Sequence, residues 1–495
     1  MSVPTESRRG TRASFAPLSD APDPSIKDDA RPLVLLALMH DYAARDFVDS
    51  KVLEELAQHV RLAFISSDRL TIDLTSYGPI VARHEMGTWR LRLWWLAAGL
   101  WHIHRRRRFE LSHRNVLRQA TFGVSARAER LVDILSRVGL ALPLALILRG
   151  LLRAIAPCVV PKNLDPSAIV VYTGVRSFFA DDIVRDARRR HIPLLALVNN
   201  WDNLNTASFL EEPPYLGVWG EQGFLIARLM HGLPAHRIFV IGAPRFEIYR
   251  KNVPTRDEAR ARLGLSPDRR VLLFCGSGCS FEEVSLLEEL DAAIEAGRLP
   301  ADLIVLYKPH PYRFKRVSER SFDASRFRHV SQVPQGRQKL TELERYPDLL
   351  VSADALISPF SSMVIEGAAF SLPALCLGYN DPGHANHDWG RAAFNLHNYP
   401  MRHGEWAVTC ERRTDFLDCC RQLVALIGDP VAAGGAVAAA EMVWRKGHVS
   451  VAKRLAEAVE RVTAGDHADE SLSRAVASIV PLVDRAADRA LLEKD

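Results

Sequence analysis

The sequence has no apolar run long enough to cross a membrane. Its longest uninterrupted apolar run, residues 138–148, contains Pro143 and has 11 residues, whereas a spanning helix needs about 20. The N-terminal stretch MSVPTESRRGTRASF lacks the apolar core of a signal peptide. These absences predict a protein without transmembrane helices that stays in the cytoplasm.

Cysteine is scarce and irregularly placed. The seven cysteines are an odd number scattered from 158 to 420, which favours reduced thiols over a disulfide framework. Cys275 and Cys279 bracket Gly-Ser-Gly, but no second Cys/His pair with ligand spacing accompanies them. No Asp-rich ligand cluster is visible either. We therefore expect no metal site and no cofactor.

The composition is that of a large globular protein with more than one domain. The chain has 495 residues, 48% of them hydrophobic and 25% charged, with a net charge of +5. A length of about 100–200 residues per domain gives two or three domains. Residues 1–30 are polar and carry four prolines, which predicts a flexible tail.

Strand-like and helix-like segments alternate in two series. The first includes PLVLLALMH, RLAFISS, AIVVYT, PLLALV and RIFVIGAP; the second includes RVLLFC, DLIVLY, ALISP and PALCLGY. This alternation predicts two doubly wound parallel sheets with helices on both faces. We expect a first domain over 31–250, a second domain over 251–465, and a C-terminal helix over 466–495 that could pack back across the first domain.

Three loops of the second series carry residues suited to an anion. Ligands of open α/β sheets bind at the carboxyl ends of strands, and the loops there hold Gly276, Ser277 and Gly278; Lys308 and His310, the latter between two prolines; and Ser361 and Ser362 at a helix start. Backbone amides and hydroxyls at such a start form a phosphate cradle. Glu366 lies one turn further and could accept ribose hydroxyls, or simply face solvent.

The order of these motifs resembles a known group of transferases. A Gly-rich loop, His310-Pro311 and Ser361-Ser362 are similar to the nucleotide-binding half of GT-B enzymes. The similarity is to bacterial sialyl- and polysialyltransferases, capsule Kdo transferases and CDP-glycerol glycerophosphotransferases. The segments Asn199–Leu204, 218–221 and 242–244 also resemble surface-carbohydrate biosynthesis proteins. The resemblance implies a GT-B fold with two Rossmann-like domains facing a cleft, and a donor phosphate held by the histidine and serines.

The first half should bind the acceptor and supply a base. Asp202 follows a strand, beside Asn200 and Trp201, which could hydrogen-bond to and stack on a sugar. The loop after the first strand adds four further candidates, none above the others: His40, Asp41, Arg45 and Asp46. The acidic-acidic-Gly base motif of sialyltransferases is not obvious in this half, so the sugar and the base stay open.

A basic, aromatic segment spans 89–108. Trp94, Trp95 and Trp101 adjoin the arginine run 105–108, so the segment is either a solvated face or an attachment to an anionic membrane. No nucleic-acid recognition module accompanies it.

These observations predict a metal-independent GT-B glycosyltransferase for bacterial surface polysaccharide. The donor would be CMP-, CDP- or UDP-linked and the acceptor a carbohydrate. His310 and Asp202 are the expected catalytic residues. The alternatives are a CDP-glycerol-type glycerophosphotransferase, a nucleotide-sugar 2-epimerase and a non-catalytic scaffold of the same fold.

Overall fold

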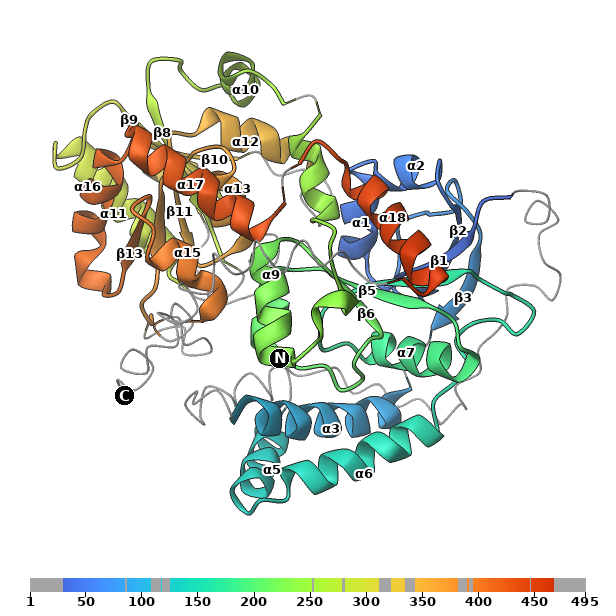
Figure 1. Cartoon of the computed structure of the whole chain (residues 1–495). Helices are drawn as coiled ribbons and strands as arrows, with labels where there is room; N and C mark the ends of the chain where they lie inside the picture. Colours follow the sequence, from blue (N-terminus) through green and yellow to red (C-terminus); the bar gives the residue numbers. More distant parts are fainter. Residues whose placement is uncertain are drawn as a thin grey trace.

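The computed structural model describes residues 30–84, 87–107, 117, 125–251, 253–277, 281–310, 322–333, 343–381, 390, 395–445 and 447–466. Within these ranges the chain forms two parallel sheets, each covered by helices on both faces (Figure 1). Two doubly wound α/β domains of the GT-B type, as the sequence predicts, are confirmed.

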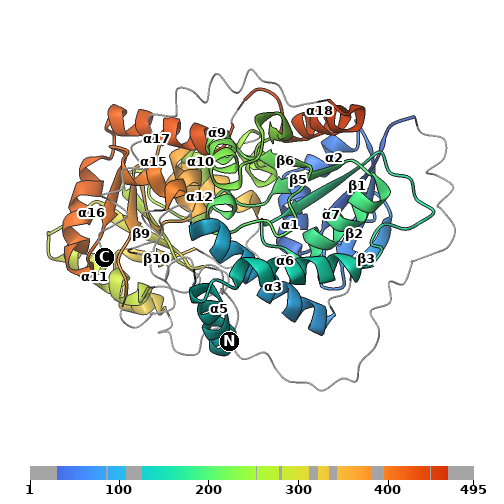
Figure 2. The ribbon, with the colours of Figure 1, turned by 60° about the horizontal axis from the view of Figure 1, so that its bottom comes forward.

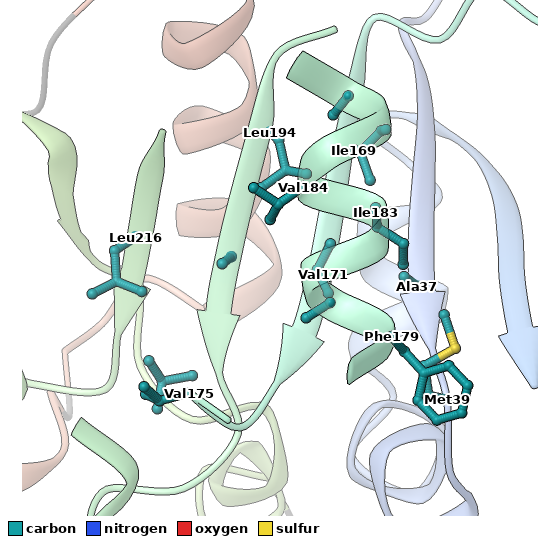
Figure 3. Close-up of a cluster of buried hydrophobic side chains, with 14 of the residues drawn as sticks. Ala37, Met39, Ile169, Val171, Val175, Phe179, Ile183, Val184, Leu194 and Leu216 are labelled. Atoms are coloured by element: carbon teal, nitrogen blue, oxygen red, sulfur yellow. The ribbon is translucent and has the colours of Figure 1, made fainter. Parts of the chain in front are cut away.

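The first sheet has seven parallel strands in the order β3-β2-β1-β4-β5-β6-β7. They are β1 (Leu33–Leu38), β2 (Arg61–Ser67), β3 (Ile80–His84), β4 (Ala168–Thr173), β5 (Leu194–Val198), β6 (Tyr215–Val218) and β7 (Ile238–Val240). Every residue of β1 and β5 is buried, as expected for strands with helices on both faces. Helix α7 (Phe178–Arg190) packs Phe179, Ile183 and Val184 onto β1, β4 and β5 (Figure 3).

The second sheet has six parallel strands in the order β10-β9-β8-β11-β12-β13. They are β8 (Arg270–Cys275), β9 (Leu303–Lys308), β10 (Val330–Gln332), β11 (Ala355–Pro359), β12 (Ala374–Leu377) and β13 (Ala407–Cys410). The strand order reverses between β8 and β11, and in the first sheet between β1 and β4. Ligands of doubly wound sheets bind beside such reversals, at the carboxyl ends of the strands.

The remaining helices flank the sheets. Those of the first domain are α1 (Asp41–Val48), α2 (Val52–Leu56), α3 (Thr88–Arg107), α5 (Ala126–Arg137), α6 (Ala141–Ala154), α8 (Asn203–Thr206) and α9 (Glu221–Ile226). Those of the second are α10 (Arg256–Leu263), α11 (Glu283–Glu295), α12 (Tyr346–Ser352), α13 (Ser362–Ala368), α15 (Tyr399–Arg402), α16 (Phe416–Ala425) and α17 (Pro430–Val443). In Figure 1, α3, α5 and α6 form a separate layer beneath the first sheet.

The chain returns to the first domain at its end. Helix α18 (Val451–Ala464) packs against α2, β4 and β5, and Leu455 and Val459 join the core of the first sheet (Figure 2). The domain bounds predicted from the sequence place residues 451–464 in the second domain. The sequence analysis expects a later helix, over 466–495, to return to the first domain, and that segment lies outside the described residues apart from Asp466.

A shared apolar cluster joins the two domains. Trp201, Trp219 and Phe246 lie in one buried cluster with residues of the second sheet and of α17. Gly220 allows this contact, because a Cβ there would lie 2.5 Å from the carbonyl oxygen of Val443 at the end of α17. The motif at 218–221 is therefore part of the junction between the domains.

Candidate functional site

The loop after β8 holds an internal carboxylate. Glu283, at the start of α11 and 1% exposed, accepts hydrogen bonds from the amide of Ser277 (2.7 Å) and the hydroxyl of Tyr307 (2.6 Å). A Cβ on Gly276 would lie 2.3 Å from this carboxylate, so the glycine makes room for it. A phosphate on the Ser277 amide would have to displace Glu283. Gly278 lies outside the described residues.

The loop after β9 begins with Lys308 and His310. Lys308 is 7% exposed, and its ammonium lies 4.8 Å from the ring centre of Tyr346. Burial opposes its charge, but Tyr346, Cys275 and Glu366 outweigh that effect and raise the pKa of Lys308, so the side chain is a buried cation.

His310 itself is half-buried, and burial, with a smaller contribution from Lys308, lowers its pKa to about 4. At neutral pH the imidazole is therefore uncharged and has one N–H to donate to a phosphate oxygen. Pro311 lies outside the described residues.

The loop after β11 leads into helix α13. Ser361 occupies the N-cap position with an extended backbone, but its side chain does not cap the helix. Its hydroxyl lies instead 2.9 Å from that of Ser358. Ser361 and Ser362 are both half-buried. Ser361 therefore does not cap helix α13, although capping is the ordinary role of a serine at this position.

Glu366 is deeper than expected. It is fully buried, and its carboxylate oxygens bind Arg245 (3.0 Å) and the hydroxyl of Tyr249. Glu366 does not face solvent. The ribose contact stays a prediction, and it would require a ribose hydroxyl to reach a fully buried carboxylate.

Arg245 is the residue that sequence reasoning missed. It follows the Gly-Ala-Pro turn after β7, in a short 3-10 helix over Pro244–Tyr249. Burial disfavours its charge, but Glu366 and then Asp46 hold the pKa of Arg245 above its ordinary value. The available signal was its position directly after a motif at the carboxyl end of a strand.

In the first domain, Asp202 has the environment of a base. It follows β5 and precedes α8, and its side chain does not cap that helix. The Oδ1 atom is buried without a hydrogen-bond partner among the described residues. Burial raises the pKa of Asp202 to about 6. A carboxylate with a pKa near the working pH suits general-base catalysis.

The neighbours of Asp202 have structural partners. Trp201 is 6% exposed and packs edge-on against His397 of the second domain, with ring centres 4.8 Å apart. Stacking of Trp201 on a sugar does not fit this position, because its ring fills the domain junction. Asn200 accepts a hydrogen bond from the amide of Trp201 (3.0 Å). Asn199, one residue earlier, donates to the hydroxyl of Tyr42 in α1 (3.2 Å).

The four candidates after β1 divide into two pairs. His40 stacks on Tyr42, and Asp41 accepts hydrogen bonds from the amide and hydroxyl of Thr71 (2.6 and 2.8 Å). Burial, then Arg69, lowers the pKa of His40.

The second pair is more deeply placed. Arg45 and Asp46 form an ion pair at 2.9 Å, and Asp46, 3% exposed, accepts the hydroxyl of Tyr172 at 2.9 Å. The Nε atom of Arg45 is buried without a partner among the described residues. Asp46 thus fastens helix α1 to β4, and Arg45 is the better candidate for an anion.

The three tryptophans Trp94, Trp95 and Trp101 do not form an exposed face. Trp94 is 2% exposed and donates to Asp181 (2.6 Å), while Arg176 lies over Trp95 and Arg149 over Trp101. Attachment to a membrane through these three rings is therefore not supported. Residue 108 and the side chains of residues 106 and 107 lie outside what the structure describes.

The two domains contact each other at the carboxyl ends of their strands. Trp201 contacts His397, Arg245 binds Glu366, and Asp49 at the end of α1 accepts the amide of Leu343 at 3.4 Å. Residues after the carboxyl ends of the first sheet thus touch residues after those of the second. Within the described ranges, no group of three or more His, Cys, Asp or Glu side chains could hold a metal ion; metal independence stays a prediction.

Comparison with known proteins gives one family match. Residues 211–380 match the sequence model of the CDP-glycerol:poly(glycerophosphate) glycerophosphotransferase family. This segment contains Gly276, His310 and Ser361 and ends just beyond β12. No curated protein matches the chain.

Several solved structures are similar in shape at low sequence identity. The calicheamicin glycosyltransferase CalG4 is 13% identical, with a TM-score of 0.48 over 88% of this chain and 99% of its own. The UDP-GlcNAc 2-epimerase from Neisseria meningitidis bound to UDP-GlcNAc is 13% identical (TM-score 0.45; 87% and 100%). The wall teichoic acid polymerase TagF is 11% identical (TM-score 0.43; 88% and 90%).

The family match over residues 211–380 confirms the expected resemblance to CDP-glycerol glycerophosphotransferases, and with it the expectation of a transferase.

Proposed function

We propose that this chain transfers a glycosyl group from a nucleotide-activated donor to a carbohydrate acceptor for a surface polysaccharide. The observation that carries the proposal is the order of the second sheet. Its neighbouring strands β9, β8 and β11 are followed by loops that hold His310, Gly276 and Ser361, beside the point where the strand order reverses. The donor nucleotide would lie across these three loops.

The proposed chemistry divides between the domains. The acceptor hydroxyl attacks the anomeric carbon, and Asp202 takes its proton as the new C–O bond forms. The bond from that carbon to the nucleotide phosphate breaks, and the phosphate leaves with the electron pair. The N–H of His310 and the hydroxyls of Ser361 and Ser362 stabilise the charge that develops on the phosphate.

Glycerophosphoryl transfer is a second candidate, because the matched family is named for it. Attack would then occur at the phosphorus nearest to glycerol, with CMP as the leaving group. The same base and the same three loops would serve. The two reactions differ in the donor, so the choice of nucleotide derivative distinguishes them.

A thermal-shift screen against CMP, CDP, UDP and GDP tests the donor site. We expect at least one nucleotide to raise the melting temperature, and the same donor class to support label transfer to a carbohydrate acceptor. A scaffold without a donor site would respond to none. A 2-epimerase would convert the nucleotide-sugar alone, with no acceptor added, which would refute transfer.

A further inference from the structure

Helices α5 and α6 expose an apolar surface outside the candidate site. Of the 13 large hydrophobic residues exposed in the described structure, seven lie between residues 131 and 151. On α6, Leu146, Ile147 and Leu151 are 47, 65 and 45% exposed. On α5 and the turn after it, Ile134 and Val138 are 58 and 61% exposed. We call these five residues the α5–α6 surface.

The exposed residues of α6 form an apolar stripe along its outer side. Residues 146, 147, 150, 151 and 154 of α6 are all exposed and uncharged, and they recur at the intervals of one helical face. The opposite side of α6 packs inward, where Ala141 and Ala145 join a core with Leu100 and Ile103 of α3. None of the described elements therefore covers the outer stripe.

The helix is also held firmly in place. Glu211, which is 1% exposed, binds Arg149 and Arg153 of α6 and Arg185 of α7. Because α6 is fixed to the domain on its inner side and by this carboxylate, its outer stripe is presented on a rigid support. In Figure 1, α6 lies on the side of α3 away from the first sheet.

Two exposed arginines lie beside this surface. Of the five arginines between residues 126 and 154, Arg149 and Arg153 pair with Glu211, and Arg137 pairs with Asp133 at 2.8 Å. The other two, Arg127 and Arg130, are exposed on the face of α5 that carries Ile134 and Val138, and Glu129 lies between them in the sequence. Aliphatic side chains beside arginine are the composition of a helix that lies in the headgroup region of an anionic bilayer.

We propose that the α5–α6 surface docks the protein onto an anionic lipid bilayer. The two exposed arginines favour anionic lipid over a second copy of this chain, whose own arginines would repel it. The two helices lie on the bilayer and do not cross it. No single described helix has the length and apolarity to span, and α5 and α6 reach that length only as a pair bent by 119°. This surface is independent of the donor site and differs from the aromatic segment 89–108.

Flotation of the full chain with vesicles tests the docking. We expect the protein to bind phosphatidylcholine vesicles that contain roughly one third phosphatidylglycerol, and to bind much less to pure phosphatidylcholine. The double variant Ile147→Glu/Leu151→Glu should lower the partition coefficient by about tenfold or more, because it places two negative charges in the stripe that would enter the bilayer. Arg127→Glu/Arg130→Glu should weaken binding and reduce its dependence on salt.

Val431→Glu is the matched control, since Val431 is 62% exposed on α17 in the second domain. It should bind like the wild type, and all variants should keep the wild-type melting temperature. Absence of binding to anionic vesicles, or equal binding by the Ile147→Glu/Leu151→Glu variant, would overturn the proposal. So would a wild-type dimer that this variant dissociates without any vesicle binding.

Discussion

At the scale of single residues, the environment of Asp202 supports a role in proton transfer. Its buried Oδ1 atom lacks a partner among the described residues, and burial raises the pKa of the carboxyl to about 6. The group is therefore ionised above about pH 6 and available as a base, while below that pH it is protonated and inactive.

We predict that kcat rises with pH through about 6 in the wild type. Asp202→Asn should lower kcat by about 10²–10⁴-fold and remove this pH dependence, with the dissociation constant of the donor unchanged. Steady-state rates between pH 5 and pH 8 give the measurement. A variant with wild-type kcat would show that another group takes the proton.

His310 provides a second test at this scale. Its pKa is lowered to about 4, but a phosphate beside it would raise that value, so nucleotide binding should take up protons. Affinity should therefore increase as pH falls from neutrality towards 5.

His310→Ala should weaken nucleotide binding by about 10–100-fold, the usual effect of losing a hydrogen bond to a charged group. The pH dependence should disappear as well. Calorimetric titration at two pH values measures both. His329→Ala is the control, because His329 lies just before β10 and pairs with Glu295 at 3.1 Å. Equal losses in the two variants would argue against a phosphate contact by His310.

The sequence singles out Asp202 and His310 because both follow short strands rich in apolar residues, and the carboxyl ends of such strands are where ligands bind. The sequence did not indicate that Trp201 and Glu366 are buried in contacts between the domains. Trp201 packs on His397, and Glu366 binds Arg245. Such contacts depend on how two domains pack, and local periodicity carries no information about that.

At the scale of elements, one buried carboxylate links helix α6 to helix α7 of the first domain. Glu211 accepts hydrogen bonds from four arginines: Arg149, Arg153, Arg185 and Arg188. Burial opposes its charge, but these arginines, Arg153 and Arg149 foremost, lower the pKa of Glu211 to about 2. The stability that this charge contributes is present above pH 4.5 and is lost as pH falls from about 4.5 towards 2.

Glu211→Gln should destabilise the protein by about 2–3 kcal/mol. The full value for a broken buried pair is about 3–5 kcal/mol, and partial exposure of Arg153 and Arg188 reduces it. Denaturant unfolding at pH 7 measures the change.

The neighbouring Glu212 provides the matched control. It pairs with Arg237 at 3.0 Å but is 41% exposed, so Glu212→Gln should change stability by about 0–1 kcal/mol. Similar effects of the two substitutions would contradict the assigned role of Glu211.

At the scale of the whole molecule, the last described helix joins the two domains. Helix α18 follows α17 of the second domain, yet it packs on the first, where Leu455 is fully buried. Arg454 of the same helix donates to the carbonyl of Ile241 at 2.6 Å. The alternation of strands and helices predicts both sheets, but it does not specify which sheet a terminal helix covers, because an amphipathic helix fits either.

Leu455→Ala should lower the free energy of unfolding by about 2–5 kcal/mol, the range for a leucine removed from a packed core. Val449→Ala, at a residue 39% exposed just before α18, is the control and should stay close to the wild type. Denaturant unfolding distinguishes them. An unchanged Leu455→Ala variant would show that α18 does not pack on the first domain in solution.

For the molecule as a whole, we propose that a nucleotide-linked donor binds across the loops after β8, β9 and β11. Calorimetric titration of the full chain with CMP, CDP, UDP and GDP, repeated with Ser361→Ala/Ser362→Ala, tests it most directly. We predict that at least one nucleotide binds and that the serine variant binds it about tenfold more weakly or worse, with its melting temperature unchanged. No binding by any of the four, or equal affinity in the variant, would contradict the account.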